Sequence, residues 1–261
     1  MLWEELTSEE LGEAAKSGLI AVLPIGSLEK HGPHAPLGTD TLTVFNLARL
    51  AAEREPAVVL PPLYYAMVRE TRYFPGAVSL SAETLLRVLG EVCDEVSRNG
   101  FKKILIVNGH GGNAETLRSF TRDRQLSRGV DYVVYILAGL APALSREEME
   151  KITEGRLDGH GGIRETSLGL YFYPRLIKLE RVKGEGRIGS LGLPRHIFTP
   201  LEWPARALEV YIGDPRHASA EKGRVLAEGI VDSMAEAIRA IRQDERTPAI
   251  LGEFQRSAYG P

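Results

Sequence analysis

Short apolar runs alternate along this chain with longer segments in which apolar residues recur every three or four positions. The runs 19–25, 57–60, 103–108 and 131–138 are rich in branched residues and are bounded by turn residues. These features are typical of buried strands, so we expect four strands there.

Between and after these runs the apolar spacing is helical. The clearest case is 82–98, where Leu85, Leu89 and Cys93 share one face and Ser81 is a suitable N-cap. The same pattern predicts helices over 41–54, 82–98, 113–127, 149–156, 164–173 and 216–242. Alternating strands and helices predict an α/β fold in a single domain spanning 1–261, with a mostly parallel sheet flanked by helices on both faces.

The stretch 183–204 is rich in glycine and proline and shows no period. A connection of this length inside a compact domain is usually functional or poorly ordered. A lid and an inter-subunit contact both stay open as roles for it.

Composition narrows the class of protein. The chain has 261 residues, of which 43% are hydrophobic and 26% charged, enough for a full core. A net charge of −3 and the lack of a basic patch argue against nucleic-acid binding. A lone cysteine, Cys93, excludes an intramolecular disulfide, and its apolar neighbours predict an inert buried thiol. No apolar run is long enough to cross a membrane and no basic leader is visible, so we expect a cytoplasmic protein.

The first candidate site follows the predicted strand 19–25. Glu29, His31, His34 and Asp40 fall within twelve positions on a loop rich in glycine and proline. Open α/β sheets bind ligands at the carboxyl ends of their strands. Two carboxylates and two imidazoles in a confined loop repel and desolvate one another unless a cation lies between them, which suggests a divalent metal. The alternative is an ordinary solvated polar loop.

Two glycine-rich segments each carry another histidine. His110 lies in the segment 108–113 after the strongest predicted strand, and His160 precedes Glu165 in the segment 158–167. Each segment alone could be a plain turn, or could hold a phosphate at a helix N-terminus. Neither has the ending of a phosphate loop or the full dinucleotide spacing. Together the three segments favour a metal, and mixed histidine and carboxylate ligands suit zinc, manganese or iron(II) better than calcium.

Two further histidines are weaker candidates. His196 lies in the stretch 183–204, and His217 precedes the last predicted helix beside Asp214. We interpret both as surface or capping residues.

The segment from Leu23 to His34, Leu-Pro-Ile-Gly-Ser-Leu-Glu-Lys-His-Gly-Pro-His, together with Asp40, resembles the creatininase (creatinine amidohydrolase) family. Four further stretches agree with this resemblance in the same order along the chain: Phe74-Pro75-Gly76, the segment 108–113, Glu165-Thr166-Ser167, and Gly213-Asp214-Pro215 followed by 218–223. The resemblance covers roughly residues 15 to 235.

The resemblance implies an α/β domain with two divalent metal ions (Zn, Mn or Fe) that hydrolyses the C–N bond of a small-molecule amide, often as a homohexamer. By position, the metal ligands it implies are Glu29, His31, Asp40 and His110, with Asp40 as the bridging carboxylate. Creatininase proper has a glutamate where this chain has Gly112, so Glu165 is the replacement ligand that we expect. His160 then resembles the residue that shuttles the proton, and we expect His160 and Glu165 to be catalytic.

The substrate stays open within the family, which includes creatininase, a deformylase of formylaminopyrimidine nucleotides and a peptidase of the mycofactocin precursor. The two tryptophans, Trp3 and Trp203, lie outside the matching segments, which argues against creatinine. A phosphate could be bound by arginines near the candidate segments, which otherwise are solvated surface residues: Arg69, Arg72, Arg164 and Arg195. A non-catalytic metal-binding or nucleotide-binding protein is the alternative of a different class.

Overall fold

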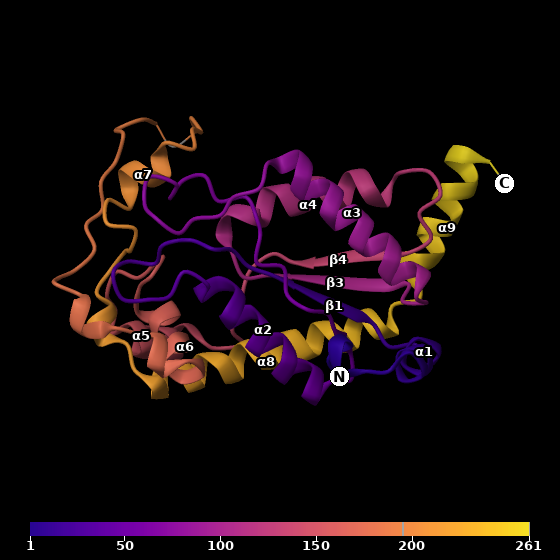
Figure 1. The fold of residues 1–261 in the computed structure, drawn as a ribbon, viewed down its shortest axis with the longest axis horizontal. Helices are drawn as coiled ribbons and strands as arrows, with labels where there is room; N and C mark the ends of the chain where they lie inside the picture. The colour runs from indigo at the N-terminus through magenta and orange to yellow at the C-terminus, as the bar shows by residue number, and fades with distance from the viewer. Residues whose placement is uncertain (195, 261) are drawn as a thin grey trace.

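A parallel sheet of four strands forms the centre of the computed structural model, which describes residues 1–194 and 196–260 (Figure 1). The strands are β1 (Ala21–Ile25), β2 (Val58–Val59), β3 (Lys103–Asn108) and β4 (Val133–Leu137), in the order β2-β1-β3-β4. Every neighbouring pair is parallel. The predicted α/β fold is therefore confirmed, although β2 and β4 are shorter than the apolar runs that carry them.

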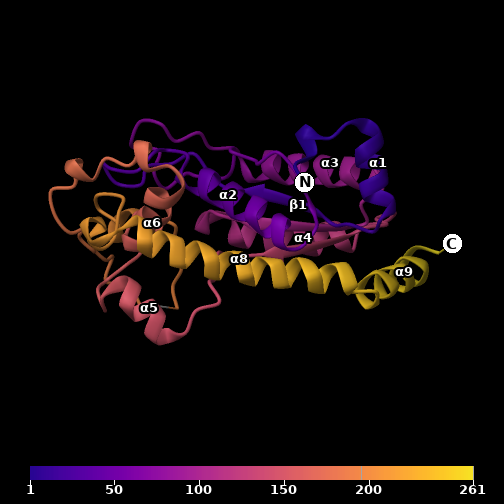
Figure 2. The same cartoon turned by 90° about the horizontal axis from the view of Figure 1, so that it is seen from below.

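Helices cover both faces of the sheet, as expected. α3 (Ala82–Arg98) and α4 (Ala114–Gln125) lie on one face, while α2 (Thr39–Arg54) and α8 (Ala220–Gln243) lie on the other (Figures 1 and 2). The pleat of β1 divides its side chains between the two resulting cores. Val22 packs into the core with α2 and α8, whereas Leu23 packs into the core with α3 and α4.

Two terminal helices were not predicted. α1 (Ser8–Lys16) and α9 (Arg246–Tyr259) each bury a single residue, Ala14 and Leu251 respectively. Both helices are nevertheless amphipathic, and Leu11 and Ala15 of α1 pack against the core formed with α3 and α4, so the sequence carried a signal that the prediction missed. No helix in the described parts of the chain is long and apolar enough to span a membrane.

The bounds of the remaining helices differ from the predicted ones by a few residues. α5 (Arg146–Thr153) and α6 (Ile163–Phe172) lie close to the expected ranges, and α7 (Glu202–Arg206) is a short turn inside the glycine- and proline-rich stretch. The expected start of the last helix at 216 is wrong. Ser219 caps α8 by accepting a hydrogen bond from the Lys222 amide, which fixes the first turn after it.

The carboxyl ends of β1 and β3 meet at one edge of the sheet, where Ile25 is opposite Asn108. Gly26, directly after β1, lies against the first turn of α2. Only glycine fits here, because a β-carbon would lie 2.3 Å from Thr41 Oγ1. The loop 26–38 and the loop 109–113 therefore start side by side. α6 packs on α8 and α2 and brings the segment 158–165 to the same edge.

Candidate metal centre and cavity

Four side chains form a buried cluster: three lie on loops that leave β1 and β3, and Asp40 lies in the first turn of α2. Glu29, His31, Asp40 and His110 have exposed fractions of 2%, 0%, 6% and 7%. Asp40 lies between the two histidines: its Oδ1 is 3.0 Å from His31 Nε2, and its Oδ2 is 3.0 Å from His110 Nδ1. Glu29 Oε1 approaches His110 Nδ1 to 2.8 Å. The structure thus brings together all four residues that the resemblance implied as ligands.

Neighbouring polar groups hold this cluster in place. Ser27 Oγ donates to Asp40 Oδ2 at 2.7 Å. Asn108 Oδ1 accepts from the His110 amide at 3.1 Å and from Asn113 Nδ2 at 3.2 Å. No role was predicted for Ser27 or Asn108, although Asn108 ends one predicted strand and Ser27 lies two positions after another. That position was the available signal, since strand ends at this edge face the site.

Two side chains from the third segment join the cluster. Glu165 Oε2 is 3.6 Å from His31 Nε2 and accepts from the Gly161 amide at 2.7 Å. The His160 ring stacks on the His31 ring, with centroids 4.1 Å apart and planes at 25°. His160 Nε2 donates to the Lys30 carbonyl at 2.9 Å. His160 and Glu165 therefore face the same buried centre as the sheet-borne residues.

The charges of the cluster are strongly coupled. Burial alone would lower the pKa of His31, but Asp40, Glu165 and Glu29 outweigh it and raise that pKa to about 10. His110 behaves likewise, because Asp40 and Glu29 raise its pKa well above the usual value against the effect of burial. Burial opposes ionisation of Asp40, yet the two histidines hold its pKa well below the usual range. Without a metal, protonated imidazoles supply the positive charge that the carboxylates require.

Among the buried atoms of the cluster, His110 Nε2 has no hydrogen-bond partner, and Glu29 Oε1 and His31 Nε2 contact only other charged side chains of the cluster. Potential ligand atoms in the described residues converge within 4.8 Å in two groups, Glu29 with His31 and His160, and Glu29 with Asp40 and His110. Buried oxygen and nitrogen atoms that converge in this way are the donor arrangement that a divalent cation satisfies. The residues present therefore fit a metal centre.

His34 lies apart from this centre although it shares the first loop. Its Nε2 is 2.9 Å from Thr166 Oγ1, and burial lowers its pKa to about 4. A neutral imidazole in this place links the loop to α6. His196 is exposed, and His217 pairs with Glu154 at 2.9 Å near the surface, which agrees with their interpretation as surface residues.

Trp203 lies outside the matching segments of the sequence, but the fold brings it to the site. Its ring meets the His160 ring edge-on, with centroids 5.2 Å apart and planes at 86°. Trp3 packs on Phe101 instead. The glycine- and proline-rich stretch 183–204 thus folds over the segment 158–167. No local sequence pattern predicts this contact. One tryptophan therefore contacts the third segment in space, although none lies in it along the sequence.

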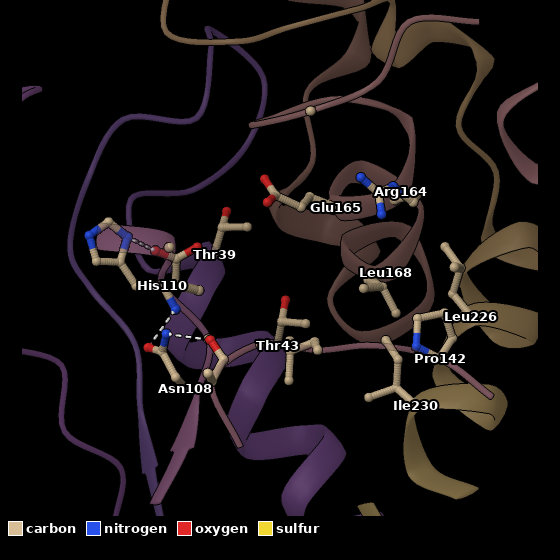
Figure 3. A pocket seen from close by; sticks show the side chains of 17 residues that line it. Thr39, Thr43, Asn108, His110, Pro142, Arg164, Glu165, Leu168, Leu226 and Ile230 are labelled. Atoms are coloured by element: carbon tan, nitrogen blue, oxygen red, sulfur yellow. Dashed lines mark hydrogen bonds and ion pairs between the residues drawn. The ribbon is translucent and has the colours of Figure 1, made fainter. Parts of the chain in front are cut away.

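A cavity of about 220 Å³ opens beside the cluster (Figure 3). Asp40, His110 and Glu165 line it together with Arg164. Its remaining walls include apolar side chains: Leu140, Pro142, Leu168, Leu226 and Ile230.

The arginines considered for phosphate binding occupy different places in the structure. Arg164 lines the cavity, whereas Arg69 and Arg72 are exposed residues outside its lining. Arg195 lies outside the described residues.

A parallel α/β sheet with a buried histidine and carboxylate cluster at the ends of neighbouring strands defines a class of metal-dependent enzyme. The family can be stated more closely. The model of the creatininase family (creatinine amidohydrolase) matches residues 4–238, and the chain belongs to that family. It is a creatininase-family hydrolase.

Individual relatives cover nearly the whole chain. Creatinine amidohydrolase of Pseudomonas putida is 30% identical over 250 residues, which are 90% of this chain and 95% of that protein. The mycofactocin precursor peptide peptidase of Mycobacterium ulcerans is 30% identical over 246 residues, 88% of this chain and 90% of that protein. A solved mutant creatininase of the Zn–Zn type superposes with a TM-score of 0.79 at 27% identity, covering 93% of this chain and 98% of that chain. Another solved creatininase is a manganese form.

Proposed function

We propose that this chain is an amidohydrolase that uses two divalent metal ions to hydrolyse a non-peptide C–N bond in a small amide. The observation that carries the proposal is the position of Asp40, whose two carboxylate oxygens each lie 3.0 Å from a different histidine. A carboxylate that faces two histidines in this way is suited to bridge two cations. Asp40 is the bridging ligand in this proposal.

In this proposal the other ligands fall into two groups, one near each carboxylate oxygen of Asp40. Glu29 and His110 belong to one side, and His31 and Glu165 to the other. A side chain at Gly112 would start 2.5 Å from His110 Nε2, so this loop has little room for a ligand there. Glu165 supports the replacement role because its carboxylate approaches His31 from α6. Zinc, manganese and iron(II) all suit this donor set.

Bound divalent metals would polarise the amide carbonyl and lower the pKa of a bound water towards neutrality. The protein's own groups would handle the proton. A carbonyl oxygen accepts only, so the bond from His160 to the Lys30 carbonyl places a hydrogen on Nε2. Nδ1 of His160 is then the atom that takes the proton and passes it to the leaving nitrogen. Stacking on His31 and the edge of Trp203 fix the orientation of this ring.

The size of the cavity supports a small substrate. Sites for drug-sized ligands occupy about 300–1,000 Å³, whereas this cavity is about 220 Å³. A formylaminopyrimidine nucleotide or a precursor peptide would place only its reacting end inside. Both activities stay as alternatives within the family. A non-catalytic binding protein is disfavoured, because the complete set of Glu29, His31, Asp40 and His110 is present.

We also propose that the chain works as a homo-oligomer. Large apolar side chains are exposed along the stretch around α7: Ile188, Leu191, Leu193, Ile197, Phe198, Leu201 and Leu208. Phe198 is 81% exposed and Leu201 is 65% exposed, and such a concentration is typical of interaction surfaces. Sedimentation equilibrium of the wild type and of the double variant Phe198→Glu, Leu201→Glu tests this. A monomeric wild type would refute it.

The experiment that tests the function is elemental analysis of the purified protein combined with an amidase screen. Creatinine, formylated amines, a formylaminopyrimidine nucleotide and short peptides are incubated with and without added zinc or manganese. We expect about two metals per chain and turnover of a small amide. Protein that takes up no metal in the presence of either cation would overturn the proposal.

A further inference from the structure

Arg164 lies in the first turn of α6, next to Glu165, and lines the cavity. Figure 3 shows Arg164 and Glu165 on one side of the cavity, with His110 and Asn108 on the other. A substrate whose reacting bond lies near His110 would therefore extend its remote part towards Arg164. The mechanism proposed above gives this arginine no role.

Arg164 is held by Asp158, whose side chain is only 4% exposed. Nε of Arg164 donates to Asp158 Oδ2, while Asp158 Oδ1 accepts from the backbone amides of Ile163 and Arg164. Asp158 thereby caps α6 and fixes the side chain of Arg164 at the same time. In the described parts of the chain, no hydrogen bond uses Nη1 or Nη2 of Arg164. The outer edge of the guanidinium is left for a ligand.

Apolar walls adjoin this edge. Leu168 comes from the same helix as Arg164, and Leu226 and Ile230 come from α8. Figure 3 places these three side chains on the same side of the cavity as Arg164. The Arg164 side chain is 43% exposed, so a charged group bound there would be shielded from water only on the side of these apolar walls.

We propose that Arg164 binds a carboxylate of the substrate through Nη1 and Nη2, so that the natural substrate is a small amide carrying a carboxylate beside a short aliphatic group. The planar edge of a guanidinium matches the two oxygens of a carboxylate, and a lysine offers no such fork. The apolar walls accommodate the aliphatic group. The proposal rests on the proposed function for the position of the C–N bond, but carboxylate binding itself requires no turnover.

Calorimetric titration tests the proposal with two ligands of one shape, 3-methylbutanoate and 3-methylbutan-1-ol. The purified protein is used with the metal that it contains. We expect the wild type to bind the carboxylate at least about tenfold more tightly than the alcohol. Arg164→Gln should weaken carboxylate binding by about the same factor and leave alcohol binding unchanged. Arg87→Gln, an exposed arginine of α3, is the matched control and should change neither.

Arg164→Lys covers the case in which Arg164→Gln fails to fold, because lysine still neutralises Asp158. This variant should retain the fold by circular dichroism and lose most of the preference for the carboxylate. The titrations are repeated after chelation, since bound metals also attract carboxylates. Equal binding of the two ligands, a preference that survives both substitutions, or one that vanishes on chelation with Arg164 intact would each overturn the proposal. If only the proposed function is wrong, the result is different: the protein still prefers the carboxylate to the alcohol but hydrolyses no amide.

Discussion

The two halves of the candidate site are built on different kinds of support. Glu29, His31 and His110 leave the ends of adjacent parallel strands and are almost fully buried. His160 and Glu165 come from the segment that opens α6, and the Glu165 side chain is 40% exposed. One half is an extension of the sheet core, and the other is a helix packed against it.

This difference suggests a division of work. Buried side chains fixed by Ser27 and Asn108 cannot reorient cheaply, which suits ligands that must hold a cation in constant geometry. The helix-borne half meets the cavity and carries the groups that would contact a changing substrate. We therefore expect substitutions of Glu29, His31, Asp40 or His110 to remove metal, and substitutions at His160 or Glu165 to lower catalysis while at least one metal stays bound.

The largest effect is expected from Asp40→Ala. Its two oxygens face both histidines, so its loss should remove both metals and lower activity by more than about 1,000-fold. Elemental analysis and the rate with the best amide measure this. Asp123→Ala, an exposed carboxylate on α4, should leave both unchanged. Retention of two metals per chain by Asp40→Ala would refute the bridging role.

Glu165→Gln should remove one metal and spare the other, because Glu165 approaches only His31. We expect about half the metal content and a rate lowered by at least about 100-fold. Glu115→Gln is the matched control, since Glu115 is also in the first turn of a helix but is exposed. Unchanged metal content and rate would show that Glu165 is no ligand.

His160→Gln should lower the rate by about 100-fold or more while the metals remain bound, as expected for loss of a proton carrier. The same variant also tests whether His160 is a metal ligand, because its ring lies close to possible ligand atoms of Glu29 and His31. Metal lost together with activity would make His160 a ligand. His196→Gln, in an exposed position, serves as the control.

A separate effect, on stability and not on catalysis, concerns the metal-free protein at high pH. The pKa of His31 is about 10 in the folded protein and about 6.5 in the unfolded chain. A raised pKa stabilises the folded state fully below about pH 6.5, and this contribution is lost as the pH rises through about 10. We expect the free energy of unfolding after chelation to fall across that range, on the order of 1 kcal/mol per pKa unit.

Urea unfolding at both ends of that pH range measures this fall. His31→Gln should flatten the dependence, because the titrating group is gone. A metal-free wild type whose stability is constant across the range would contradict the coupled charges of the cluster.

Much of the fold follows from local pattern. The runs 19–25 and 103–108 each combine branched residues with turn boundaries, and both became central strands. α1 and α9 were missed although both are amphipathic, and the start of α8 depended on the cap at Ser219 rather than on the apolar period. Helices were predicted where a long face is fully buried, as in α3 and α8, and were missed at the two ends of the chain, where each buries a single residue.

The sequence by itself determined which candidate ligands gather at the ends of β1 and β3 and at the start of α2. Glu29, His31 and Asp40 follow one strand and His110 follows another, and parallel strands end at the same edge, so their meeting was predictable. Tertiary structure alone decided the rest. The packing of α6 on α8 brought Glu165 and Arg164 to the cavity, and the return of the chain at α7 placed Trp203 against His160. These contacts join segments with no shared period, and only the packing of the whole molecule brings them together.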